Sequence, residues 1–322
     1  MSWSWPWTGI FRDLVESRQS ELQLAQYVAV LAGVRKALDD WVPASRLDAY
    51  RQVLKKLGLH MEIDCLFRPL PQTMHIPGAE AVPTTRAFGM RYQGTSADGA
   101  TTAHVIVASR SDWAIEALAA AWYSVAVEDR IIRKPLIDHY RFGHALGYPG
   151  CCVQFFLNHN DWPRMNTLAD AATNSTGICW ETNSFPKHTI WMSVFHMPCA
   201  FDCAPTRSQT NAVLEAIRDL DRRYAEHIER FMRQPILAAS EVLCYALVGG
   251  RLTTRGRVAY ERPIYLGGDR RHDDYARSLA SGDEVAVSDG TIFVWRSGSL
   301  IEVLETHCDR GVVEVPLLLI FQ

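Results

Sequence analysis

The residue pattern between positions 284 and 305 constrains the fold of this chain more than any other feature. It reads EVAVSDGTIFVWRSGSLIEVLE, three apolar or alternating stretches separated by an Asp-Gly pair and a Ser-Gly pair. Such pairs form two-residue hairpin turns, because glycine adopts positive φ at little steric cost. The pattern therefore predicts an antiparallel strand meander. VVEVPLLLIFQ, at the C-terminal end of the sequence, is expected to add one more strand.

Helical periodicity dominates the first 60 residues, recurs between residues 109 and 146, and is strongest after residue 205. The longest pattern, about Thr206–Met232, places apolar residues at spacings of three and four, as an amphipathic helix requires. Ser109 or Ser111 is the expected N-cap of the predicted helix at residues 109–130. The other predicted helices cover an apolar face at residues 22–34 that ends at Trp41–Pro43, and residues 44–57, 109–130, 135–146 and a short segment after Cys152.

Strand patterns lie between these helices. Residues 61–108 look like strands, and Phe88–Tyr92 is expected to form a hairpin with Ala103–Ala108 around a Gly- and Asp-rich turn. Thr189–Phe195 is predicted to be a buried strand, and residues 160–186 to be irregular. We therefore predict an α+β fold: a helical N-terminal part, a central mixed body with a cysteine site, and the C-terminal meander. The expected domains are residues 1–234 and 235–322.

Composition narrows the class of protein. The formal net charge of −3 is small for 322 residues, which argues against a dedicated nucleic-acid binder. No uncharged apolar run reaches the length of a membrane span, so we expect no membrane partner. The start, MSWSWPWTG, lacks a basic segment followed by an apolar core, so no secretory signal is expected. A cytoplasmic location follows from this, and there cysteines stay reduced or bind metal.

The eight cysteines are concentrated in one segment, with five of them between Cys151 and Cys203. Four lie in two loops constrained by proline or glycine, LGYPGCC (146–152) and HMPCAFDCAP (196–205), each leading into a predicted helix. Free N–H groups and the helix dipole stabilise thiolates at a helix N-terminus. A disulfide between neighbouring cysteines is strained. If the loops meet, they form a thiolate site made of Cys151, Cys152, Cys199 and Cys203.

The spacing of these cysteines favours an iron–sulfur centre, most simply a 4Fe-4S cluster. Structural zinc sites usually use cysteine pairs separated by two to four residues, whereas Cys151 and Cys152 have no spacer. Prolines beside cysteines, as at Pro198 and Pro205, are common in cluster-binding loops. Three alternatives stay open: a zinc-stabilised binding module without catalysis, a thiol redox or nucleophilic protein, and packed core cysteines. Cys179 is a candidate fifth ligand.

The two cysteine loops also carry a family resemblance. LGYPGCC resembles the Gly-Tyr-Pro-x-Cys-Cys motif of an uncharacterised, mostly archaeal domain family. With HMPCAFDC, it is similar to the cysteine-rich domains of heterodisulfide reductases, which implies an unusual iron–sulfur cluster. Those domains have glycine after the double cysteine and a later CxxC pair, whereas this chain has Val153 and Cys-x3-Cys. The resemblance is confined to residues 146–203 and implies no particular activity.

Three residues near the cysteines are candidate catalytic groups. His196, three residues before Cys199, is a candidate metal ligand, an acid/base group, or a buried hydrogen-bonded histidine. Asp202 is expected to cap the helix that follows it or to orient a metal ligand. Tyr148 is a candidate proton donor, or a side chain packed under the Pro-Gly turn.

The remaining candidates have weaker patterns. Helical spacing places a polar face on the predicted helix that leads to Cys151. The sequence contains neither a nucleotide-binding glycine motif nor a serine-hydrolase motif. We therefore expect a metalloenzyme, an oxidoreductase or transferase acting on a small molecule by redox, sulfur-transfer or Lewis-acid chemistry. An electron- or sulfur-donor protein is its candidate partner. The weaker site candidates are Asp138, Arg141, His144, Glu181 and His188, and the expected core cysteines are Cys65, Cys244 and Cys308.

Overall fold

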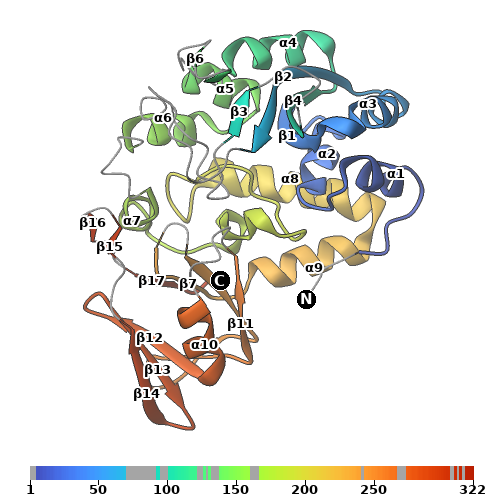
Figure 1. The fold of residues 1–322 in the computed structure, drawn as a ribbon. Coiled ribbons are helices and arrows are strands. Elements are labelled where there is room, and N and C mark those ends of the chain that lie inside the picture. The colour runs from blue at the N-terminus through green and yellow to red at the C-terminus, as the bar shows by residue number, and fades with distance from the viewer. Residues whose placement is uncertain are drawn as a thin grey trace. The chain divides into compact units, whose positions relative to one another are not determined.

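The computed structural model shows an α+β protein, which confirms the predicted class (Figure 1). Its chain divides into two compact units, Met1–Val153 and Gln154–Gln322, and the division falls inside helix α6 (Gly150–His159). The predicted boundary at residue 234 stays an expectation. The structure describes residues 5–69, 92–94, 101–121, 126–127, 130–131, 138–159, 167–240, 243–266, 273–304, 308–309, 312–313 and 316–322.

The first unit is built on an antiparallel sheet with the strand order β1-β4-β2-β3. Its strands are β1 (Ala37–Pro43), β2 (His60–Pro69), β3 (Tyr92–Gly94) and β4 (Thr102–Ala108). The helices are α1 (Gly9–Arg18), α2 (Leu24–Leu31), η1 (Ala44–Arg46), α3 (Leu47–Lys56), α4 (Ser111–Ala120) and α5 (His139–Ala145), and a small ladder joins β5 (Ala126–Val127) to β6 (Arg130–Ile131).

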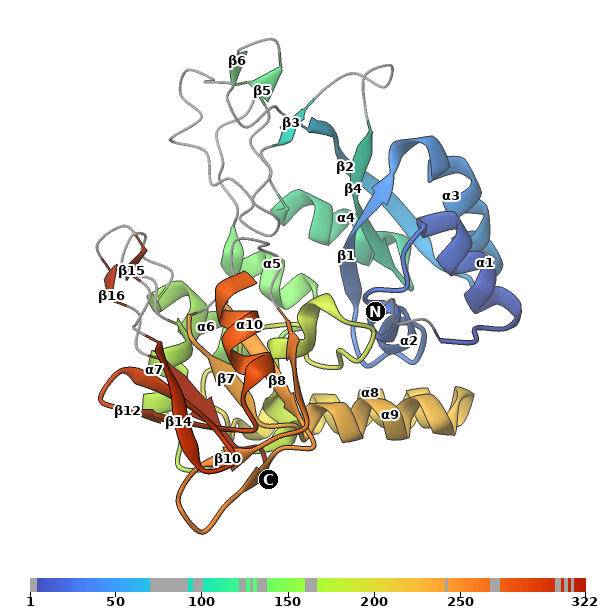
Figure 2. The ribbon, with the colours of Figure 1, turned by 60° about the horizontal axis from the view of Figure 1, so that its bottom comes forward.

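Each face of this sheet is covered by helices. Alternate residues of a strand point to opposite faces, so Leu38 and Val42 pack with Tyr27 and Tyr50 on the side of α1–α3. Ile106, on the other side, packs against small residues of α4 and the end of α5. Figure 2 shows α1 and α3 on one side of the sheet and α4 on the other. Burial on both faces explains the long apolar run in β4.

Adjacent acidic residues of β1 point to these opposite faces. Asp40 forms a buried bidentate ion pair with Arg18, at 2.5 and 3.0 Å, and accepts a hydrogen bond from Tyr27. Asp39 faces the other side, where its carboxylate lies 3.4 Å from Nε2 of His104. Two charged residues in succession are therefore compatible with a strand buried on both faces, because each has its own cationic partner.

Several local predictions for the first unit were wrong. The helix expected to reach residue 41 ends at Leu31, and β1 follows, because its side chains alternate between two buried faces. β3 pairs with β2 rather than with β4; residues 88–91 lie outside the described chain. Helix α4 ends at Ala120, β5 follows, and the residue preceding α4 is Arg110, with no side-chain cap.

The second unit contains the predicted meander. Strands β12, β13 and β14 pair antiparallel, and Asp289, Gly290, Ser297 and Gly298 all adopt positive φ in the two turns. This confirms the turn prediction. The sheets have the orders β14-β13-β12-β10-β9 and β11-β8-β7-β17. Their strands are β7 (Ile236–Ala238), β8 (Cys244–Val248), β9 (Arg251–Leu252), β10 (Val258–Ala259), β11 (Arg262–Tyr265), β12 (Glu284–Ser288), β13 (Thr291–Arg296), β14 (Ser299–Leu304) and β17 (Leu317–Leu319).

The helices of the second unit differ from the prediction in two places. The expected helix 206–232 is two helices that meet at Asp221, which has extended backbone and accepts a hydrogen bond from the backbone N–H of Tyr224 at 3.0 Å. A helix also forms at 167–173, where irregular chain was expected. The helices are α7 (Thr167–Thr173), η5 (Trp180–Thr182), η6 (Phe185–His188), α8 (Ala204–Leu220), α9 (Arg222–Met232) and α10 (Asp273–Ser281), with β15 (Cys308–Asp309) paired to β16 (Val312–Val313).

The segment predicted as a strand at 189–195 is buried but is not a strand. Its polar groups bond locally and to helix α9: the backbone N–H of Trp191 donates to the hydroxyl of Thr189, and Tyr224 donates to the carbonyl of Ile190. These bonds satisfy the segment without a neighbouring strand. In the described part of the chain, every helix is too short or too polar to cross a bilayer.

Candidate metal centre

The four predicted cysteine ligands form one group. The sulfur atoms of Cys151, Cys152, Cys199 and Cys203 all lie within 4.8 Å of one another, and those of Cys151 and Cys152 are 3.9 Å apart. The predicted grouping is therefore confirmed. Four sulfur atoms at these distances can bind a metal ion together.

The Gly-Tyr-Pro-Gly sequence places the first two cysteines at the start of helix α6. Gly147 ends α5 with φ +78°, and a side chain there would approach the backbone nitrogen of Lys36 to 3.3 Å. Pro149 then begins the next helix, since its carbonyl accepts hydrogen bonds from the N–H groups of Cys152 (2.9 Å) and Val153 (3.0 Å). Cys151 and Cys152 therefore lie in the first turn of α6, whose remaining length belongs to the second unit.

A buried arginine holds the turn that precedes this pair. Arg35 is 1% exposed, and its Nε donates to the carbonyl of Leu146 at 2.9 Å. Its guanidinium lies 5.0 Å from the centre of the Tyr148 ring. Burial raises the pKa of Tyr148 to about 12, so the phenol is protonated at neutral pH. Tyr148 packs in the turn as the simpler interpretation expected, and its proposed role as proton donor stays a prediction.

Hydrogen bonds from the end of helix α7 fix the loop that carries Cys199 and Cys203. The side-chain amide of Asn174 donates to the carbonyl of Cys199 at 3.1 Å, and the backbone N–H of Phe201 donates to Ser175 at 2.6 Å. Cys203 occupies the capping position of α8, where its backbone N–H donates to Ala200 at 3.1 Å. Both cysteine pairs therefore lie beside the N-terminal end of a helix, which favours negative charge.

Asp202 does not cap helix α8, so that prediction was wrong. Its carboxylate accepts hydrogen bonds from the backbone N–H of Thr176, at 3.0 Å, and from the hydroxyl of the same residue. The hydrogen bond from the Thr176 side chain lowers the pKa of Asp202. Asp202 thus ties the Cys199–Cys203 loop to the chain after α7.

His196 reaches the cysteine group through a threonine. Nε2 of His196 lies 2.9 Å from the hydroxyl of Thr206, and that hydroxyl donates to the sulfur of Cys203 at 3.3 Å. Because the hydroxyl has one proton, it accepts from His196 while it donates to the sulfur. Sequence reasoning missed Thr206; its signal was its position, one helical turn after Cys203.

Cys179 is not a member of the four-cysteine group. Its backbone N–H donates to the carbonyl of Phe201 at 2.7 Å, which places it beside the loop, and its role as a ligand stays a prediction. Cys244 is 4% exposed in β8 and Cys65 is half-buried in β2. The side chains of Cys308 and His188 lie outside the described residues.

The polar face predicted ahead of Cys151 has mostly local partners. Asp138 caps helix α5 by accepting from the backbone N–H of Arg141 at 3.0 Å. The ring of His144 packs edge-on against Tyr140, with ring centres 4.5 Å apart. Glu181, a separate candidate in η5, also has a partner, because its carboxylate lies 3.6 Å from the guanidinium of Arg207.

Sequence reasoning also missed a buried histidine between two carboxylates in the first unit. His104 is fully buried; its Nδ1 lies 3.0 Å from Asp64 and its Nε2 lies 3.4 Å from Asp39. Burial by itself lowers the pKa of His104, but hydrogen bonds and charge from Asp39 and Asp64 outweigh it and raise the pKa to about 9. The signal in the sequence was a histidine within an apolar strand, AHVIVA.

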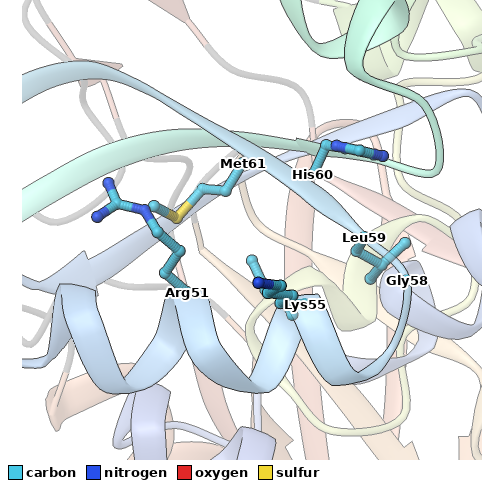
Figure 3. Close-up of a pocket in the computed structure, with 7 residues that line it drawn as sticks. Arg51, Lys55, Gly58, Leu59, His60 and Met61 are labelled. Atoms are coloured by element: carbon cyan, nitrogen blue, oxygen red, sulfur yellow. The ribbon is translucent and has the colours of Figure 1, made fainter.

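A shallow hollow in the first unit lies where α3 ends and β2 begins. Figure 3 shows Arg51, Lys55 and His60 around it, together with the less polar Leu59 and Met61. Arg51, Lys55 and His60 are exposed to solvent, and no candidate residue lines the hollow. The hollow therefore adds nothing to the cysteine group.

Comparison with protein families, with curated proteins and with solved structures finds no match to this chain. The candidate function therefore depends on the geometry of the site.

Proposed function

We propose that this chain is a metalloprotein whose four clustered cysteines bind one metal ion as thiolates. The observation that supports the proposal most directly is the spacing of the sulfur atoms, all within 4.8 Å of one another. In a tetrahedral zinc site with a metal–sulfur bond near 2.3 Å, neighbouring sulfur atoms are about 3.8 Å apart. The 3.9 Å between Cys151 and Cys152 agrees with such a site.

The same spacing bears on the kind of centre. In a four-iron cluster each thiolate binds a different iron, so the irons and sulfides stand between the cysteine sulfur atoms and hold them further apart. A single ion needs no such separation. The geometry therefore supports zinc, which prefers tetrahedral thiolate sites, over the 4Fe-4S cluster that the cysteine spacing favoured.

The iron–sulfur enzyme remains a second candidate, because Pro198 and Pro205 flank the second cysteine pair as they do in cluster-binding loops. In that case the centre would supply redox, sulfur-transfer or Lewis-acid chemistry to a small molecule, with an electron- or sulfur-donor protein as partner. The two cysteine loops would have to move apart to make room for a four-iron cluster. The resemblance of LGYPGCC to the archaeal domain family is compatible with either centre.

Metal analysis of protein purified without oxygen tests the proposal. We expect one zinc per chain, no acid-labile sulfide and no visible colour; replacement by Co²⁺ should give the absorption of a tetrahedral thiolate complex. Stoichiometric iron and sulfide would support the cluster instead. A protein that binds no metal under any of these conditions would contradict both centres.

Single serine substitutions then assign the ligands. Cys152→Ser, Cys199→Ser and Cys203→Ser should each weaken metal affinity more than about tenfold, since losing a ligand costs at least as much as losing a residue that orients one. Cys244→Ser is the matched control, because Cys244 is buried in β8 outside the group. Cys179→Ser decides whether that residue contributes.

A further inference from the structure

The four cysteines of the group differ in their access to solvent. Cys152 is 1% exposed and Cys203 is 6% exposed, while Cys199 is half-buried. Cys151 is exposed. A structural zinc site fills all four coordination positions with protein ligands, so the reactivity of each thiolate then depends on its access to solvent. Here one cysteine residue is exposed and the other three are covered to different degrees.

Two of the less exposed members of the group are held by hydrogen bonds. The hydroxyl of Thr206 donates to Cys203, which draws electron density from that sulfur, and Asn174 holds the backbone of Cys199. Buried cysteines are chemically inert, whereas exposed thiolates near positive potential are reactive. Cys151, in the first turn of α6, combines exposure with the positive end of a helix.

We propose that Cys151 is a metal-bound nucleophile that accepts an alkyl group from a soft carbon electrophile. This inference rests on the proposed metal centre, because the metal keeps the thiol deprotonated at neutral pH. A lone pair of the Cys151 sulfur forms the new carbon–sulfur bond. The bond from that carbon to its leaving group breaks, and the leaving group departs with the electron pair. Neither the sulfur nor the metal needs an external oxidant or reductant.

The chemistry of the site selects this class of substrate. A divalent ion with four thiolates carries excess negative charge, which makes the exposed sulfur electron-rich. Thiolate sulfur is soft and reacts with polarisable carbon centres. After transfer Cys151 would be a neutral thioether and a weaker ligand, and Cys152, Cys199 and Cys203 would be the residues that hold a bound metal ion.

Alkylation mapping tests the inference on the full, metal-loaded chain. Zinc content is measured first; the protein then reacts with substoichiometric methyl iodide, and peptide mass spectrometry locates the added methyl groups. We expect Cys151 to be methylated at least about tenfold faster than Cys152, Cys199 or Cys203, because only an accessible thiolate reacts readily. Zinc should stay bound when one methyl group has been added. Cys151→Ser should abolish the fast reaction, and Cys244→Ser should preserve it.

Two outcomes would overturn the inference while the metal centre stands. The first is a zinc-loaded protein in which all four cysteines are equally protected while Cys179 reacts, as in a closed structural site. The second is release of zinc in step with the first methylation, since the other three thiolates would then not hold the ion. A protein without metal would instead refute the proposed function, and this inference with it.

Discussion

Thr206 lies outside the four-cysteine group but is connected to it by a hydrogen bond. Its side chain is fully buried and bridges His196 to the sulfur of Cys203. Residues that orient a metal ligand usually change affinity by 10–100-fold when they are removed. Thr206→Val keeps the volume and deletes the hydroxyl. We therefore expect zinc affinity to fall about tenfold, measured by competition with a chromophoric chelator.

Thr210→Val is the matched control for this substitution. Thr210 is also buried on helix α8, but its hydroxyl donates to the carbonyl of Glu181 at 2.7 Å. The control should lower the free energy of unfolding by about 1 kcal/mol and leave zinc affinity unchanged. Equal affinity losses in the two variants would mean that Thr206 acts only through the packing of α8.

At the scale of elements, Asp221 separates helix α8 from helix α9. Its side chain caps α9 through the backbone N–H of Tyr224. Loss of such a cap typically costs about 1 kcal/mol. We expect Asp221→Ala to lower the free energy of unfolding by about that amount, with zinc affinity retained because Cys203 precedes the opposite end of α8. Chemical denaturation followed by circular dichroism measures the change.

Asp219→Ala provides the comparison within the same turn of chain. Asp219 is exposed in the last turn of α8, where a negative charge meets the negative end of the helix dipole. Its removal should leave stability unchanged or slightly raised. If Asp219→Ala destabilised the protein as much as Asp221→Ala, the cap would not explain the break between the two helices.

At the scale of the whole molecule, the buried histidine of the first unit makes stability depend on pH. The pKa of His104 is raised from 6.5 to about 9 in the folded chain. The folded state therefore binds this proton more tightly, so the stabilisation is complete below about pH 6.5 and is lost as pH rises through 9. We expect the free energy of unfolding to fall by on the order of 3 kcal/mol across that range. Denaturant titrations at successive pH values measure it.

Asp64→Asn separates this effect from the general titration of the chain. The substitution removes the carboxylate 3.0 Å from Nδ1 of His104, so it should lower the pKa of the histidine and flatten the pH dependence. Asp48→Asn, at a side chain that is 93% exposed, should leave the profile unchanged. A wild-type protein with constant stability between pH 6.5 and 9 would contradict the assignment.

Local sequence patterns predicted the parts of the fold in which turn residues and the apolar pattern indicate the same element. The meander at 284–304 follows from its turns, because Asp-Gly and Ser-Gly fix the strand order and the pairing next to each turn. Local patterns failed where strand pairing with distant residues decides the secondary structure. Residues 37–43 were predicted as the end of a helix, but they form β1, whose side chains alternate between two buried faces. The division of 206–232 at Asp221 was missed for another reason: the apolar spacing continues through Asp221, whereas the signal for the break is its capping of α9.

The sequence by itself determined the kind of site: cysteines paired in two loops, each with proline or glycine that ends one element and begins a helix. Only the tertiary structure decided that four sulfur atoms lie within 4.8 Å of one another, that Cys179 is not among them, and that Cys151 alone of the four is exposed. The physical reason is that chain breaks and helix starts are local, whereas distances and solvent access depend on residues about 50 positions apart coming together.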